Sequence, residues 1–113
     1  MTASLTLNLL QGSVSFRFNT EAAVALQTEI SQLVTQLKAI AVQVNQGGRP
    51  EKQESLEYRY SGDVFLEVFC NPNIYPSPFA AKVLLTVRDD RIRLTTEAEL
   101  PRLIEDLNTF LEQ

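Results

Sequence analysis

Acidic side chains are the residues of this sequence whose spacing comes nearest to a catalytic arrangement. They occur in close pairs at Asp89/Asp90, Glu97/Glu99 and Glu105/Asp106. Catalysis by two carboxyl groups requires them to share a site but to differ in environment, so that one holds a proton and the other does not. Adjacent residues on a helix point apart instead. We therefore do not expect catalysis from any of these pairs.

The absence of histidine restricts the possible chemistry further. The chain has no histidine and one cysteine, Cys70. Histidine is the commonest general base near neutral pH, so Ser-His and Cys-His nucleophile pairs are excluded, as is a structural zinc site. The phosphate-binding P-loop, the dinucleotide fingerprint and the nucleophile elbow are also missing. We expect no catalytic residue, no metal and no cofactor, and we interpret Cys70 as a buried apolar side chain.

Basic side chains gather in the C-terminal half of the chain. The cluster comprises Lys82, Arg88, Arg91, Arg93 and Arg102. Such a cluster can bind an anionic ligand or RNA, but Asp89 and Asp90 lie between the arginines and no RNP-type motif is present. The chain also carries 14 acidic against 10 basic residues, a net charge of −4. A salt-bridged solvent face is the simpler interpretation. We do not expect nucleic-acid binding, and RNA contacts through the arginines remain an alternative.

A proline-rich segment between two predicted strands is the second candidate surface. Residues 71–78 include Pro72, Pro76 and Pro78, which forbid a regular ladder and favour an extended surface connection. Prolines lower the entropy lost on binding, and an exposed tyrosine offers contact area with a polar tip. The predicted partner-binding residues are therefore Ile74, Tyr75, Phe79, Arg88, Arg91 and Arg93.

Alternation of apolar and polar residues predicts the strands that position these side chains. It runs through residues 5–9 and 14–18, 56–60 and 64–70, and 81–87 and 91–95, which we interpret as three hairpins. Gly12 supplies the first turn, residues 61–63 the second, and Asp89-Asp90 a two-residue third turn. Strands joined by tight turns are antiparallel neighbours.

Two amphipathic helices complete the predicted fold. Apolar residues recur at helical spacing over 21–45, with Asn19 or Thr20 as the N-cap and Gly47-Gly48 after the end. Thr96 and Glu99 have capping-box spacing, but Pro101 favours a tight turn at 96–100 before a C-terminal helix. The predicted fold class is α+β: a single layer of about six antiparallel strands in the order ββα-ββββα, packed by one long and one C-terminal helix.

The length of the first helix predicts self-association. At the usual rise per residue it is about 36 Å long, whereas strands of five to seven residues span roughly 17–23 Å. A helix longer than its sheet overhangs, and overhanging apolar turns need a cover. We therefore expect a homodimer as one form of the protein.

Length and composition limit the compartment and the domain count. The chain has 113 residues, which fits a single domain over 1–113. One cysteine permits no intrachain disulfide and favours a reducing compartment. The start Met1-Thr2-Ala3-Ser4 has no cationic region, so we expect no signal peptide. No apolar run approaches the roughly 18 residues of a membrane span. We expect a soluble, cytoplasmic protein without membrane insertion.

Together these patterns favour a non-catalytic protein–protein interaction module, such as an adaptor, an assembly factor or a regulatory subunit. Its expected partner is another protein. The alternative is a small-ligand-binding protein or a minor enzyme, with a pocket between sheet and helices near Tyr58, Tyr60 and Arg93.

Overall fold

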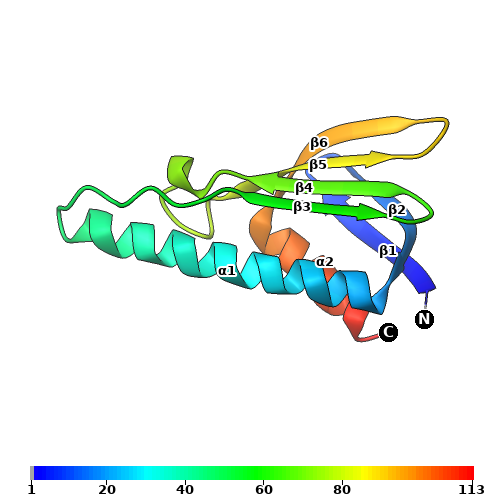
Figure 1. Cartoon of the computed structure of the whole chain (residues 1–113), viewed down its shortest axis with the longest axis horizontal. Coiled ribbons are helices and arrows are strands. Elements are labelled where there is room, and N and C mark those ends of the chain that lie inside the picture. The colour runs from blue at the N-terminus through cyan, green and yellow to red at the C-terminus, as the bar shows by residue number, and fades with distance from the viewer. Residues whose placement is uncertain (1) are drawn as a thin grey trace.

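A computed structural model describes residues 2–113, and Met1, the first residue of the predicted N-terminal segment, lies outside them. In chain order the elements are β1 (Thr2–Leu9), β2 (Gly12–Asn19), α1 (Thr20–Asn45), β3 (Leu56–Ser61), β4 (Phe65–Cys70), the short 3₁₀ helix η1 (Pro72–Ile74), β5 (Lys82–Arg88), β6 (Arg93–Glu99) and α2 (Leu100–Leu111) (Figure 1). The predicted α+β class and the order ββα-ββββα are confirmed. The proline segment contains η1, so it is not extended throughout as predicted.

The strands form two sheets instead of the predicted single layer. β1 pairs with β2, and β3-β4-β5-β6 form a four-stranded sheet, with every pair antiparallel. β1 approaches β6, but no ladder joins them. Asp106 of α2 accepts a hydrogen bond of 2.8 Å from the backbone N–H of Asn8 on β1. A side chain that occupies an edge amide prevents strand pairing at that point.

Helix α1 follows the predicted pattern closely. The side-chain oxygen of Asn19 accepts a 2.7 Å hydrogen bond from the backbone N–H of Ala22, as an N-cap does. The buried residues of the helix are Ala23, Leu26, Ile30, Leu33, Leu37 and Ile40. Gly47 follows the helix with φ of 78°, a conformation that glycine adopts without steric cost.

The turn of the third hairpin is longer than predicted. Arg88 and Arg93 are the last paired residues, so residues 89–92 form a four-residue turn. The backbone N–H of Asp89 donates to the carbonyl of Ile92 at 3.0 Å. The carboxylate of Asp89 in turn accepts from the N–H groups of Arg91 and Ile92 at 2.8 and 2.9 Å. These side-chain bonds stabilise the longer turn.

The predicted turn at residues 96–100 is wrong. Thr96 and Ala98 continue β6, opposite Leu85 and Val83 of β5. Helix α2 begins directly after the strand at Leu100, with Pro101 in its first turn as predicted. Pairing with the apolar strand β5 outweighs the local capping signal. The ladder satisfies backbone N–H and C=O groups along the whole segment, whereas a capping box would satisfy only single N–H groups.

Both helices lie on the same side of the four-stranded sheet (Figure 1). They share one core with the β1–β2 hairpin. Phe18 of the hairpin packs against both the four-stranded sheet and α2. Its ring centroid lies 4.8 Å from that of Tyr60 on β3 and 5.9 Å from that of Phe110 on α2. The opposite side of the sheet has neither helix against it and is called the outer face below.

The end of α1 extends past the four-stranded sheet, as its 26 residues require (Figure 1). The chain then returns along the helix, where the backbone N–H of Glu51 donates to Gln43 at 2.8 Å. The side-chain amide of Asn73 binds both the N–H and the carbonyl of Gln53, each at 2.8 Å. The overhang is therefore partly covered by the chain itself, although Val42 and Val44 remain 53% exposed.

Candidate partner-binding surface

The six residues predicted to bind a partner lie at opposite ends of strand β5. Ile74, Tyr75 and Phe79 precede the strand, and Arg88 ends it. Arg91 and Arg93 belong to the turn beyond Arg88 and to the start of β6. Seven residues of strand separate the two groups by roughly 20 Å. Five of the six are exposed, with Phe79 85% and Ile74 67% exposed, whereas Tyr75 is half-buried and packs against the shared core.

Apolar side chains on the outer face join these two groups, and sequence reasoning did not single them out. Leu66, Val68 and Leu85 point into the core, so alternation places their neighbours on the outer face. On the two central strands those neighbours include Phe65, Phe69 and Leu84. Phe69 and Leu84 are directly opposite each other across β4 and β5. Leu84 is 43% exposed.

The outer face is thus unusual for a sheet covered on one side. Antiparallel sheets of this kind normally present polar residues to water. A signal for the exception is present in the sequence, because β4 carries Phe65 and Phe69 on either side of Glu67 on the face opposite to its buried residues. A strand that is apolar on both faces is typical of one that is buried on both.

Arg88 lies over the ring of Phe65, with the guanidinium carbon 4.3 Å from the ring centroid. The two residues are cross-strand partners on β5 and β4. A guanidinium that stacks on an aromatic ring keeps its donors free at its edge. Arg93 lies beside Arg88 on β6, so two cations are adjacent at this end of the outer face.

A hollow of about 210 Å³ marks the other end of the outer face. Its walls come from β4, β5, β6 and the proline segment: Phe69, Cys70, Asn71, Ile74, Tyr75, Lys82, Leu84 and Glu97. The proline segment therefore meets the outer face here. Burial, aided by the nearby Cys70 and Glu97, raises the pKa of the Tyr75 hydroxyl, which stays protonated as a hydrogen-bond donor.

The charged groups of the outer face are arranged by register. Arg59 and Glu67 are cross-strand partners joined by an ion pair of 2.7 Å. Arg93 stands at one end of β6 and Glu97 towards the other, both exposed. Within residues 2–113, neither Arg93 nor Glu97 takes part in an ion pair.

Several side chains that could take part in a reaction are instead buried or held in structural hydrogen bonds. Burial raises the pKa of the Cys70 thiol to about 11. The Asp89 carboxylate holds its own turn, and the hydrogen bonds from Ile92 and Arg91 lower its pKa. Asp106 is 6% exposed and binds Asn8. Arg102 lies 3.7 Å from Asp106 on α2, so it does not join the arginines of β5 and β6.

Tyr58, Tyr60 and Arg93 do not line one pocket. The Tyr58 hydroxyl donates to the carbonyl of Ala22 at 3.0 Å, and burial raises its pKa to about 12. Tyr60 accepts a 3.2 Å hydrogen bond from the Asn19 amide. Arg93 is on β6, with two strands between it and β3. The pocket that these residues were expected to form is therefore not assembled.

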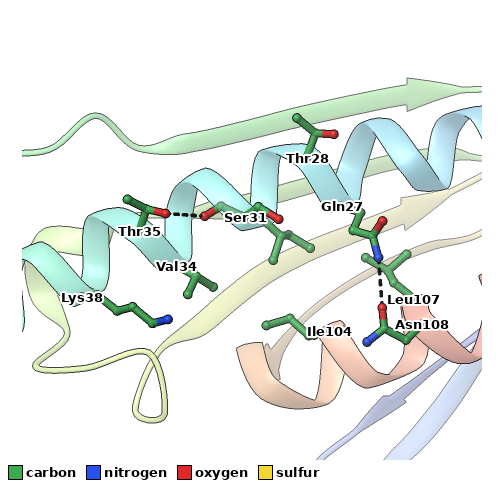
Figure 2. Close-up of a pocket in the computed structure, with 10 residues that line it drawn as sticks. Gln27, Thr28, Ser31, Val34, Thr35, Lys38, Ile104, Leu107 and Asn108 are labelled. Atoms are coloured by element: carbon green, nitrogen blue, oxygen red, sulfur yellow. Dashed lines mark hydrogen bonds between the residues drawn. The ribbon is translucent and has the colours of Figure 1, made fainter.

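A shallow groove of about 410 Å³ separates α1 from α2 (Figure 2). Val34 and Ile104 project into it from the two helices, and Gln27 donates a 3.0 Å hydrogen bond to Asn108 across it (Figure 2). Lys38 is its one charged residue. The groove therefore offers an apolar floor with hydroxyl and amide walls, and no pair of groups suited to proton transfer.

Among residues 2–113, no helix is both long and apolar enough to cross a membrane. No three histidine, cysteine or acidic side chains of the described residues are grouped so that they could hold a metal ion. Comparison of the chain with protein-family models, with curated proteins and with solved structures finds no match.

Proposed function

We propose that this protein is a non-catalytic protein–protein interaction module, such as an adaptor, an assembly factor or a regulatory subunit, and that it binds its partner through the outer face of the four-stranded sheet. The observation that carries the proposal is the row of Phe65, Phe69 and Leu84 at outward positions of β4 and β5. Leu84 is exposed, Phe65 and Phe69 are half-buried, and Glu67 lies between the two phenylalanines on β4. Apolar side chains on the open face of a sheet mark an interaction site.

The chemistry of the outer face is that of a binding surface. Apolar contact with Phe69 and Leu84 supplies affinity, at about 25 cal/mol for each Å² removed from water. Arg88 over Phe65 combines an aromatic ring with free donors, and arginine and aromatic residues dominate the energetics of interfaces. Ile74 and Tyr75 extend the surface at the end of the sheet.

The state of the reactive groups supports a role without catalysis. A thiol with a pKa of about 11 holds its proton at neutral pH and is a poor nucleophile. The carboxylates of Glu67, Asp89 and Asp106 are bound to Arg59, to a turn and to a strand edge respectively. The buried free thiol also suits a reducing compartment such as the cytoplasm.

The test removes exposed apolar surface from the outer face and measures the size of the native assembly. The first double variant combines Phe69→Ser and Leu84→Ser. The control double variant combines Val42→Ser and Val44→Ser, and it removes exposed apolar surface at the end of α1. Size-exclusion chromatography of gentle lysates from cells that naturally make the protein follows each variant at its native level, and circular dichroism confirms folding.

We expect the wild type and the Val42/Val44 variant to elute well above 12.7 kDa, the mass of one chain. The Phe69/Leu84 variant should elute at that mass. Loss of the assembly with the Val42/Val44 variant alone would place the binding surface on α1 and contradict the proposal, as would elution of the wild type as a single chain.

A further inference from the structure

We infer that the protein bound at the outer face is a second copy of this chain, packed face to face about a two-fold axis with the strands antiparallel. The inference rests on the proposed function, because it names the occupant of the same surface. Its basis is the distribution of charge and apolar residues along the strands.

The outer face can be described as columns that run across the strands. One column contains Phe65, Arg88 and Arg93. The column four residue pairs further along the strands contains Phe69, Leu84 and Glu97. Between them lies a column with Glu67, Thr86 and Thr95. Within these three columns, the arginines without an ion-pair partner among residues 2–113, Arg88 and Arg93, lie at one end, and Glu97 lies at the other. Lys82 lies beyond Glu97, where its cross-strand partner is Glu99.

A two-fold axis that lies over the middle column, perpendicular to the strands, exchanges the two outer columns. Phe65 then lies over Phe69 of the second copy, and Arg93 lies over Glu97 of the second copy. Symmetry makes each contact twice, as in every isologous interface. Both apolar contact and opposite charge are satisfied by one operation.

A two-fold axis parallel to the strands also brings Phe69 over Leu84 of the second copy, but it opposes like charges at the edges of the sheet. It places β3 of one chain over β6 of the other, so that Glu57 opposes Glu97 of the second copy. Like charges at an interface suppress that arrangement. In the antiparallel arrangement the charged residues that meet their own symmetry mates on the axis are Arg59 and Glu67. Within each chain these two residues neutralise each other through an ion pair of 2.7 Å.

The surface is free to make this contact within the described part of the chain. Leu84, Arg93 and Glu97 are exposed, and both helices lie on the other side of the sheet. Two sheets packed face to face lie about 10 Å apart, a gap that phenylalanine, arginine and glutamate side chains span.

Sedimentation equilibrium of the purified full-length chain with charge-swapped variants tests the inference. Arg93→Glu alone and Glu97→Arg alone each oppose like charges twice, and each should raise the dimer dissociation constant at least about tenfold. The double variant exchanges the partners and should return the constant to within about threefold of the wild type. Arg49→Glu, the same charge change at an exposed position in the loop after α1, is the matched control and should alter it less than about twofold.

Two outcomes overturn the inference. One is a purified wild type that is monomeric at all accessible concentrations, and the other is a dimer that the double variant fails to restore. If the purified chain is monomeric while the native assembly still depends on Phe69 and Leu84, the second copy is rejected and the proposed binding function stands. If that assembly is also independent of Phe69 and Leu84, both are rejected.

Discussion

Asp106 on α2 binds Asn8 on β1 twice, through hydrogen bonds of 2.8 Å from the backbone N–H and from the side-chain amide. The two residues are 98 positions apart in the sequence. Their contact attaches the last helix to the first strand and occupies an edge amide that would otherwise be free to pair. Asp106 carries the one buried carboxylate among the residues that the structure describes.

Replacing Asp106 by alanine should therefore destabilise the fold strongly. Asn8 would keep two donors with no acceptor, and hydrogen bonds to a charged group contribute about 1.5–3 kcal/mol each. We expect the free energy of unfolding to fall by about 2–3 kcal/mol in urea denaturation. Glu105→Ala, on the neighbouring exposed residue, should change it by less than about 0.5 kcal/mol. Equal midpoints for the two variants would contradict the role of Asp106.

The N-cap of α1 gives a second stability prediction. Asn19→Ala removes the acceptor for the N–H of Ala22 and the donor to the Tyr60 hydroxyl. We expect the free energy of unfolding to fall by about 1 kcal/mol from loss of the cap, and by a smaller amount from loss of the hydrogen bond to Tyr60. Thermal and urea unfolding of Asn19→Ala and of the adjacent Thr20→Ala compare a cap with an exposed helical position. A variant at 19 no less stable than the variant at 20 would show that the cap is dispensable.

The buried thiol makes a prediction about reactivity. With its pKa at about 11 instead of 9.0, Cys70 carries about a hundredfold less thiolate at pH 8 than an exposed cysteine. Labelling by a thiol-specific disulfide reagent should be at least about a hundredfold slower in the native protein than in urea, and burial slows it further. Immediate stoichiometric labelling of the native chain would contradict the burial of Cys70.

The same pKa fixes the direction of a pH effect on stability. The folded state holds the Cys70 proton more tightly than the unfolded state, so its contribution is fully present below pH 9.0 and is lost as the pH rises towards about 11. Tyr58 acts in the same direction between its ordinary pKa of 10.0 and about 12. We expect the urea midpoint to fall over pH 9–11, and to fall less in Cys70→Ala when each protein is compared with its own midpoint at pH 8.

Local patterns predicted the elements because the period of a strand or helix is written in adjacent residues. Alternation through Leu66 and Val68, and the stripe from Leu26 to Ile40, gave the correct inward faces. The end of β6 was missed because Thr96 and Ala98 are weakly apolar, and their strand conformation depends on pairing with β5. The break between the two sheets was also missed, because the neighbour of a strand edge is set by tertiary packing and not by the local pattern.

The candidate surface was predicted in part for a similar reason. Sequence reasoning found the residues at its two ends, namely Ile74, Tyr75 and the arginines, from their types. It did not connect them, because the connection through Phe69 and Leu84 depends on which strand pairs with which. Only the fold shows that the apolar outward side chains of β4 and β5 lie between the proline segment and Arg88.

The claim that the outer face is covered by another protein can be tested directly by site-specific photo-crosslinking. A benzophenone side chain is placed at Leu84 on the outer face or at Thr28 on the exposed side of α1, in the full chain expressed at its native level. We predict a crosslinked protein adduct from position 84 that is lost when Phe69→Ser is added, and little or none from position 28. No adduct from position 84, or adducts of equal yield from both positions, would contradict the account.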